Sequence, residues 1–449
     1  MPRLFGTDGV RGLANRDITP ELALRLGEAA ARYVMKDRAA DAAKPKAIIG
    51  RDTRISGEFL DHALAAGLAA AGMDVERIGV VTTPTVAYMT ATEDVALGVM
   101  ISASHNPMPD NGIKFFAHGG FKLEDAVEDE IEALLESQWD RPTGALVGQI
   151  EPGAQHAEHV YVDHLVRACG TNLSGLKIVM DCANGAASSL GPEALRKAGA
   201  EVVVINASPD GLNINDECGS THPQMLQSKV VEESADFGVA YDGDADRCLA
   251  VDHEGQLVDG DKIMGALAVD LKKRGELSKD TLVVTVMSNL GLLLAMEKEG
   301  IKTVQTAVGD RYVLECMRAN GYALGGEQSG HVISAEHATT GDGVLTSLLV
   351  ARMVRESGES LAALTGFVQR LPQTLVNVPG VDKVRASTDE GLAEAVAQAE
   401  DQLGETGRVV LRSSGTEPLV RVMVEAATQA EADEHANRLA AVVKERLAL

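Results

Sequence analysis

The chain has 449 residues, of which 45% are hydrophobic and 24% are charged, as is typical of soluble globular proteins. This length exceeds what one hydrophobic core supports, so we expect several domains. Because 66 Asp and Glu outnumber 41 Lys and Arg, the formal charge is -25, which disfavours binding to nucleic acids and to anionic membrane surfaces.

The sequence shows no sign of a membrane or secreted protein. No stretch offers the roughly 20 apolar residues of a membrane span, and the amino terminus lacks a signal-peptide pattern. The five cysteines are odd in number and widely spaced, which favours reduced thiols. We therefore expect a cytoplasmic protein with no membrane partner and no nucleic-acid partner.

Two arginine-bearing loops lie in the first sixty residues. "FGTDGVRG" places Arg11 near Asp8, and "GRDTRISG" places Arg51 and Arg54 near Asp52. These arginines could bind a phosphate or form ion pairs with the neighbouring carboxylates. Both interpretations stay open at this point.

Three segments repeat one pattern of strand, polar loop, helix, glycine and strand. They span residues 46–81, 177–206 and 281–308. Short apolar β-rich runs are typical of buried parallel strands, and the helices end at positions suited to a left-handed cap. The glycines at those positions are Gly72, Gly199 and Gly300. The pattern predicts three related α/β domains with mixed, mostly parallel sheets.

The stretch "ISASHNPMPDNGIKFF", residues 101–116, joins two predicted strands through a polar loop. Asn-Pro and Asp-Asn-Gly are strong turn signals, so a structural turn is the interpretation that the stretch alone favours. The alternative is that Ser104 is a nucleophile for phosphoryl transfer, with Lys114 at the start of the next strand.

The segment "DFGVAYDGDADRCLAVD" runs from an apolar strand into three alternate carboxylates followed by Arg247. The carboxylates are Asp242, Asp244 and Asp246. Three carboxylates this close repel unless a cation or protons neutralise them, and hard divalent cations prefer oxygen ligands. The cluster predicts a Mg²⁺ site, with a surface acidic turn as the alternative. An EF-hand is disfavoured because Arg247 replaces its turn glycine.

The segment "GGEQSGHVI" sets Glu327, Ser329 and His331 at alternate positions between glycines. On an extended segment all three side chains would face the same way. A carboxylate and a hydroxyl suit the hydroxyls of a sugar, and an imidazole can move a proton near neutral pH. The alternative is an exposed glycine-rich loop.

From about Thr374 the chain reads as strands, a polar loop, a strand and a closing amphipathic helix, which predicts an α+β domain. The loop in "LRSSGTEPLVRV" combines small residues, hydroxyls and two flanking arginines, as a phosphate cradle requires. Its candidate residues are Arg412, Ser414, Gly415, Thr416 and Arg421. An ordinary hairpin turn is the alternative.

Breaks in periodicity divide the chain into four expected domains around a central cleft. Domain I carries the Ser104 loop, domain II the acidic cluster, domain III the Glu327 loop and domain IV the phosphate loop. Their expected ranges are 1–150, 151–254, 255–370 and 371–449.

Together with "FGTDGVRG", the loops "SASHNP", "DGDADR", "GEQSGH" and "RSSGTEPLVRV" resemble, in the same order, those of the α-D-phosphohexomutase superfamily. The resemblance covers the whole chain. The wording of the loops is closest to the bacterial branch that acts on glucosamine phosphates, and the glucose and mannose phosphate branches are the alternative. Residue chemistry alone does not choose the sugar.

The resemblance implies an isomerase that interconverts glucosamine 6-phosphate and glucosamine 1-phosphate and so supplies UDP-N-acetylglucosamine and cell-wall synthesis. Ser104 would be the phosphoserine, and one of its phosphoryl oxygens would join the three aspartates on Mg²⁺. Because direct migration across the ring is geometrically impossible, the enzyme would pass through glucosamine 1,6-bisphosphate or a related sugar bisphosphate, which would also act as activator.

The resemblance also assigns roles to the other candidate residues. Arg247 would steady the phosphoryl group, Arg11 would lie near the reacting phosphate, and Lys114 and His331 would assist proton transfer. Glu327 and Ser329 would hold sugar hydroxyls. The residues that would grip the phosphate not being transferred are Arg412, Ser414, Gly415, Thr416 and Arg421. A homodimer is a further implication.

Two other classes of function fit parts of the sequence. Aspartyl-phosphate phosphatases also begin with a strand followed by Asp-x-Asp. If this chain were such an enzyme, Asp242 would be its nucleophile. A sugar-phosphate sensor would keep the binding loops without turnover. Neither class accounts for Ser104 together with the complete set of loops.

Overall fold

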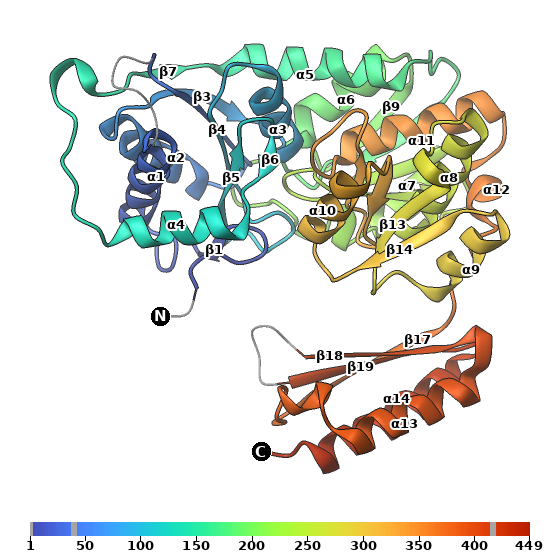
Figure 1. The fold of residues 1–449 in the computed structure, drawn as a ribbon. Coiled ribbons are helices and arrows are strands. Elements are labelled where there is room, and N and C mark those ends of the chain that lie inside the picture. Colours follow the sequence, from blue (N-terminus) through green and yellow to red (C-terminus); the bar gives the residue numbers. More distant parts are fainter. Residues whose placement is uncertain (1–2, 37–42, 414–418) are drawn as a thin grey trace.

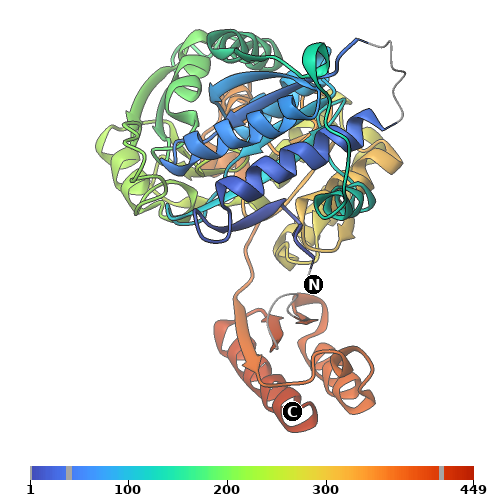
Figure 2. The ribbon, with the colours of Figure 1, turned by 90° about the vertical axis from the view of Figure 1, so that its left-hand side faces the viewer.

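The computed structural model describes residues 3–36, 43–413 and 419–449. Four sheets follow one another along the chain. The first three lie together, whereas most of the last, with its two helices, lies apart from them at the end of one segment of chain (Figures 1 and 2). It contacts the others where Arg408 and Glu425 form hydrogen bonds with residues 288–290. None of the helices in the described ranges has the length and apolar character needed to cross a bilayer.

The first sheet has the strand order β1-β5-β4-β2-β3-β7, with β6 paired to β5. Strands β2, β3, β4 and β7 pair in parallel, and β1, β5 and β6 pair antiparallel. The strands are β1 (Val10–Leu13), β2 (Lys46–Arg51), β3 (Asp74–Val80), β4 (Leu97–Ile101), β5 (Asp110–Ala117), β6 (Phe121–Lys122) and β7 (Ile150–Pro152). The helices are α1 (Pro20–Met35), α2 (Ser56–Ala70), α3 (Thr83–Thr92) and α4 (Asp125–Leu135).

Strand β2 shows why this sheet is covered on both faces. Its side chains alternate between faces, as they do in any strand. Ala47 and Ile49 belong to the apolar cluster that also contains residues of α1 and α2, whereas Ile48 belongs to the cluster that contains residues of α3. A strand buried on both faces needs a continuous apolar run, which is the pattern found in the sequence.

The second sheet has the order β12-β11-β10-β8-β9 and the third the order β14-β13-β15-β16. Their strands are β8 (Lys177–Asp181), β9 (Glu201–Ile205), β10 (Phe237–Tyr241), β11 (Cys248–Asp252), β12 (Leu257–Val258), β13 (Thr281–Thr285), β14 (Lys302–Thr306), β15 (Leu324–Gly326) and β16 (Val332–Ser334). Their helices are α5 (Ala154–Cys169), α6 (Ala187–Lys197), α7 (Gln224–Glu232), α8 (Gly260–Arg274), α9 (Leu290–Lys298), α10 (Asp310–Asn320), α11 (Gly343–Ser357) and α12 (Leu361–Thr365).

One apolar cluster extends through both of these sheets. Helix α11 lies at its centre, because it packs against α5, α6 and α8 and against strand β11. The first turn of α11 also contacts the acidic loop, since the N–H of Gly343 donates to the carbonyl of Ala245 at 2.9 Å. The shared core therefore fixes the acidic loop relative to the third sheet.

The three predicted strand–helix–strand repeats are confirmed. The pairs β2/β3, β8/β9 and β13/β14 are parallel, and each is connected through a helix. Gly72, Gly199 and Gly300 follow these helices with φ of 101°, 107° and 64°. A side chain is disfavoured at such φ values, so glycine ends each helix in a left-handed turn.

The fourth sheet is antiparallel, with the order β17-β19-β18. It consists of β17 (Gln373–Pro379), β18 (Arg408–Ser413) and β19 (Leu419–Glu425), together with α13 (Glu390–Leu403) and α14 (Gln429–Arg446). The closing helix was predicted from the sequence, but α13 was not. The expected fold class is confirmed, whereas the expected domain ranges stay a proposal.

Candidate active site

Ser104 lies in the loop between β4 and β5, as the sequence predicted. Its φ of 54° is left-handed, which is unusual for a residue with a side chain. Its N–H donates to Ser102 Oγ at 2.9 Å, and Ser102 Oγ donates to Asp52 Oδ2 at 2.6 Å. The loop is a turn that holds Ser104 in one conformation, so the two interpretations of this stretch are compatible.

The acidic loop between β10 and β11 faces Ser104. The Ser104 hydroxyl donates to Asp242 Oδ2 at 2.5 Å. Asp242, Asp244 and Asp246 are buried, and each offers one carboxylate oxygen within 4.8 Å of the others. One buried oxygen of Asp244 and one of Asp246 have no hydrogen-bond partner. Buried oxygens left without a donor fit a divalent cation, so the predicted metal cluster assembles next to the predicted nucleophile.

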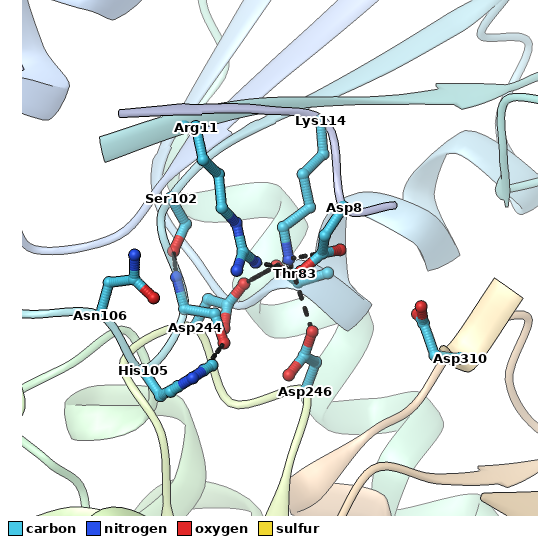
Figure 3. A network of polar contacts seen from close by, with 12 residues as sticks. Asp8, Arg11, Thr83, Ser102, His105, Asn106, Lys114, Asp244, Asp246 and Asp310 are labelled. Atoms are coloured by element: carbon cyan, nitrogen blue, oxygen red, sulfur yellow. Dashed lines mark hydrogen bonds and ion pairs between the residues drawn. The ribbon is translucent and has the colours of Figure 1, made fainter. Parts of the chain in front are cut away.

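Lys114, on β5, partly balances this negative charge. Its ammonium lies 2.9 Å from Asp244 Oδ2 and 3.5 Å from Asp246 Oδ2 (Figure 3). Thr83, the first residue of α3, donates its hydroxyl to Asp244 Oδ2 at 2.6 Å. Asp244 is therefore bound by side chains from two other elements.

The three aspartates are electrostatically unequal. Burial raises the pKa of Asp242 well above its ordinary value, and its neighbours Asp246 and Asp244 raise it further. Burial alone would also raise the pKa of Asp244, but the charge of Lys114 and the bond from Thr83 lower it below its ordinary value. Burial alone would lower the pKa of Lys114, but the surrounding carboxylates raise it, so Lys114 stays protonated.

Arg247 and His105 lie beside the nucleophile. The Arg247 guanidinium donates to His105 Nδ1 at 2.9 Å, and the Ser104 hydroxyl lies 3.3 Å from the same nitrogen. Burial and the charges of Arg247 and Arg11 lower the pKa of His105 to about 4. A neutral imidazole can accept the Arg247 bond, so His105 orients that guanidinium near Ser104.

Arg11 forms an ion pair with Asp8, and its Nε has no hydrogen-bond partner among the described residues, so its proposed contact with a phosphate stays a prediction. Asp8 also accepts a hydrogen bond from Lys122 at 2.6 Å and lies 3.6 Å from Lys114. Lys122 in turn pairs with Asp310, the first residue of α10. These residues form a chain of alternating charge between the first and third sheets. Figure 3 shows Arg11, Asp8 and Asp310 of this chain.

The glycine-rich loop corrects one expectation. The segment from Glu327 to His331 is a tight turn between β15 and β16, not an extended strand, because Glu327 N–H donates to the carbonyl of His331 at 2.9 Å. Ser329 Oγ still lies 3.5 Å from Glu327 Oε2. Glu327 and His331 both reach the start of α10, since Glu327 Oε1 accepts the N–H of Gly309 at 3.0 Å and His331 Nε2 lies 3.3 Å from Asp310 Oδ2. The expected extended conformation is therefore wrong, whereas the shared direction of the side chains stays a prediction.

The phosphate loop is only partly described. Arg412 on β18 lies directly opposite Arg421 on β19. Ser414, Gly415 and Thr416 fall outside the described residues. Among residues 3–36, 43–413 and 419–449, we find no hydrogen bond or ion pair between these two arginines and the Ser104 loop or the acidic loop.

Several residues of the site were not predicted from the sequence. Lys122, Asp310 and Thr83 were not singled out, although Asp310 follows a parallel strand at the sheet edge where sites commonly form. Thr83 likewise follows a parallel strand, β3, and begins a helix, whereas Lys122 carries no comparable sequence signal.

The chain matches models of four consecutive domains described as phosphoglucomutase/phosphomannomutase. Alpha/beta/alpha domain I matches residues 2–141, domain II residues 159–255, domain III residues 259–371 and the C-terminal domain residues 375–442.

Relatives and solved structures agree with this match. The chain is 60% identical to a phosphoglucosamine mutase from Bifidobacterium animalis subsp. lactis, with 100% of both chains covered. It is similar to the structure of a phosphoglucomutase/phosphomannomutase family protein from Burkholderia thailandensis, with a TM-score of 0.83, 24% identity and coverage of 99% and 98%. The structure of N-acetylphosphoglucosamine mutase from Aspergillus fumigatus, in complex with GlcNAc-6P and magnesium, has a TM-score of 0.72 at 20% identity, with coverage of 98% and 95%.

Proposed function

The chain belongs to the phosphoglucosamine mutases of the α-D-phosphohexomutase superfamily, and from this membership we propose that it interconverts glucosamine 6-phosphate and glucosamine 1-phosphate. The observation that carries the proposal is the 2.5 Å hydrogen bond from the Ser104 hydroxyl to Asp242 within a buried acidic cluster. A phosphoryl carrier has to lie this close to its charge-stabilising groups.

Ser104 is the proposed phosphoryl carrier. In the first half-reaction the bond between Ser104 Oγ and phosphorus breaks, and a bond forms from phosphorus to the free sugar hydroxyl, which gives glucosamine 1,6-bisphosphate. After the bisphosphate turns over, Ser104 takes the other phosphoryl group back. In the first transfer the sugar hydroxyl loses its proton and the departing Ser104 Oγ gains one. In the second transfer the Ser104 hydroxyl loses its proton and the departing sugar oxygen gains one. His331 and Lys114 are proposed for proton transfer, and the positive charge of Lys114 suits it to stabilise the transferring group.

The proposed metal is Mg²⁺, held by Asp242, Asp244, Asp246 and one oxygen of the phosphorylated Ser104. A bound cation would neutralise charge on the phosphoryl group. The buried carboxylate oxygens without a donor support this assignment. Arg247, beside Ser104, is proposed to steady the phosphoryl group, and Arg11 is proposed to lie near the reacting phosphate.

Glu327 and Ser329 are proposed to hold sugar hydroxyls. The proposed distal phosphate grip consists of Arg412, Ser414, Gly415, Thr416 and Arg421. Because the fourth sheet lies apart from the other three, its movement toward them is proposed to bring Arg412 and Arg421 to the substrate and to exclude water. A cytoplasmic location, a homodimer and a role in UDP-N-acetylglucosamine supply complete the proposal.

Intact mass and coupled assays test this function. We expect purified protein to carry one added phosphate that is absent in Ser104→Ala, and glucosamine 6-phosphate to be turned over faster than glucose or mannose phosphates when a sugar bisphosphate is supplied. Ser137→Ala, a change at an exposed hydroxyl far from the site, should keep both properties. Phosphate on an aspartate, or full activity of Ser104→Ala, would contradict the proposal.

A further inference from the structure

The backbone carbonyls of the Ser104 loop converge on one buried arginine. Arg54 donates to the carbonyl of Ser104 at 2.9 Å, to that of Asn106 at 2.8 Å and to that of Pro107 at 2.6 Å. Its side chain has no exposed surface. Three carbonyls bound by one rigid guanidinium fix the path of the loop, because the donors of that group lie in one plane.

A buried carboxylate orients Arg54 itself. Asp52 Oδ2 accepts from Arg54 Nε at 2.9 Å and also from Ser102 Oγ at 2.6 Å. Ser102 Oγ accepts the N–H of Ser104. The N–H of Ser104 is therefore bound through Ser102 to Asp52, and its carbonyl is bound to Arg54. Asp52 and Arg54 form a buried ion pair, which is one of the two interpretations that the sequence left open for this arginine.

A second side chain, from the loop that follows β9 of the second sheet, binds two of the same carbonyls. Asn215 Nδ2 donates to the carbonyl of Ser104 at 2.9 Å and to that of Asn106 at 3.2 Å. Asn215 is 9% exposed and has a left-handed φ of 58°. The carbonyl of Ser104 is thus held from two parts of the chain that are distant in sequence.

These hydrogen bonds fix the backbone conformation of Ser104 and so the position from which its hydroxyl extends. Ser104 has a left-handed φ, which costs energy in a free chain and persists only where surrounding contacts enforce it. With its N–H and its carbonyl both bound, Ser104 cannot change φ and ψ without breaking buried hydrogen bonds. Its Cβ consequently keeps its place opposite Asp242, the residue to which the Ser104 hydroxyl donates at 2.5 Å.

We propose that Arg54 and Asn215 are positioning residues that keep Ser104 aligned with the acidic cluster through both phosphoryl transfers. This inference rests on the proposed role of Ser104. The bisphosphate has to turn over between the two transfers while the nucleophile keeps its place, so the two side chains act on the rate of transfer and not on sugar binding.

The test uses full-length Arg54→Ala and Asn215→Gly, separately and combined, with glucosamine 6-phosphate, Mg²⁺ and a sugar bisphosphate activator. Glycine tolerates the φ of Asn215, so that variant removes the amide without backbone strain. We expect kcat to fall about 100-fold in Arg54→Ala, because small misplacements of reacting groups have effects of this size. In Asn215→Gly we expect a fall of about tenfold, with KM within about threefold of wild type in both.

Two further readouts separate positioning from a purely structural role. Added guanidinium should restore part of kcat in Arg54→Ala but none in Asn215→Gly. The loss in the combined variant should be smaller than the product of the single losses, since both side chains bind the same carbonyls. Arg77→Ala is the matched control, because Arg77 pairs with buried Asp61 in the same sheet region without touching the loop, and it should keep kcat.

Wild-type kcat in Asn215→Gly, or a rise in KM with unchanged kcat in either variant, would overturn the inference. If Arg54→Ala does not fold, Asn215→Gly still decides. Failure of the proposed function would give a different result: Ser104→Ala would keep its activity, whatever activity Arg54→Ala and Asn215→Gly have.

Discussion

Lys122 and Asp310 form an ion pair across the junction of the first and third sheets. Lys122 also bonds Asp8, which lies 3.6 Å from Lys114, and Asp310 lies 3.3 Å from His331. Lys122 therefore connects the surroundings of the two groups that we propose for proton transfer.

Replacing Lys122 by Met should disturb the charge of this region. Burial alone would raise the pKa of Asp8 and of Asp310, and Lys122 is among the cations that lower both values. Without Lys122 both carboxyl groups should become protonated at higher pH, so the acidic limb of kcat/KM against pH should move upward by about one unit. At neutral pH we expect a loss of about 10- to 100-fold.

The control for this prediction is Lys197→Met, which removes an exposed lysine paired with exposed Asp163. That variant should show the wild-type pH profile. An unchanged acidic limb in Lys122→Met would show that the ion pair does not influence the site.

Thr83→Val should weaken metal binding without removing a metal ligand. The variant loses the hydroxyl that donates to Asp244 Oδ2 at 2.6 Å and keeps the size of the side chain. Groups that orient metal ligands affect metal affinity, so the Mg²⁺ concentration for half-maximal activity should rise about tenfold. Activity at saturating Mg²⁺ should stay near wild type.

Thr90→Val is the matched control in the same helix, because the Thr90 hydroxyl donates to the carbonyl of Val86 and not to the acidic cluster. Chelator treatment should abolish activity in all these proteins, and added Mg²⁺ should restore it. Equal Mg²⁺ requirements for Thr83→Val and wild type would count against the role of Thr83.

Asp261→Asn should stabilise the protein at alkaline pH. Burial raises the pKa of Asp261 to about 7, and nearby Asp259 and Glu425 add to the increase. The folded state therefore binds more protons than the unfolded state between about pH 4 and 7, so this group lowers stability as pH rises through that range. The Asn side chain carries no charge and still accepts the N–H of Asn289.

We expect Asp261→Asn to gain roughly 2 kcal/mol at pH 8, because each unit of pKa shift corresponds to about 1.4 kcal/mol and part of it is lost to relaxation. The gain should vanish at pH 4. Thermal unfolding at both pH values measures it, with exposed Asp280→Asn as the control. A gain of equal size at pH 4 and pH 8 would exclude titration of Asp261 as the cause.

Glu425→Gln should loosen the fourth sheet from the third. The buried Glu425 carboxylate accepts from Arg408 at 2.7 Å, from Asn289 Nδ2 at 3.0 Å and from Leu290 N–H at 2.9 Å. Glutamine leaves the Arg408 charge unpaired, and breaking a buried pair typically costs about 3 kcal/mol or more. Limited proteolysis should cut the segment 366–372 faster, whereas the exposed Glu434→Gln should behave as wild type.

Arg421→Met tests the proposed phosphate grip. If Arg421 binds the phosphate that is not transferred, its loss should raise KM for glucosamine 6-phosphate about tenfold or more, because a charge-assisted bidentate contact is removed. The intact mass should still show phosphate on Ser104. An unchanged KM would remove Arg421 from the proposed grip.

Much of the fold could be predicted because it depends on local patterns. The apolar runs that begin at Lys46, Lys177 and Thr281 are buried parallel strands, and the glycines that end the repeat helices have the expected backbone. The acidic cluster was predicted because clustered carboxylates have chemistry that is visible in a short stretch. The stretch around Ser104 alone favoured a turn, and the hypothesis that Ser104 is a nucleophile depended on the other loops and on the family resemblance. The extended conformation expected for residues 327–331 was wrong, because that segment turns between β15 and β16.

What the sequence determined by itself was the repeated order of strand, helix and strand and the chemistry of each loop, since both follow from neighbouring residues. Only the tertiary structure decided the partners: Thr83 with Asp244, Lys122 with Asp310, and Arg54 with the carbonyls of the Ser104 loop. Those partners lie 161, 188 and 50 residues apart in the chain. Periodicity reports which face of an element is buried, but the packing of whole sheets determines which side chain that face meets.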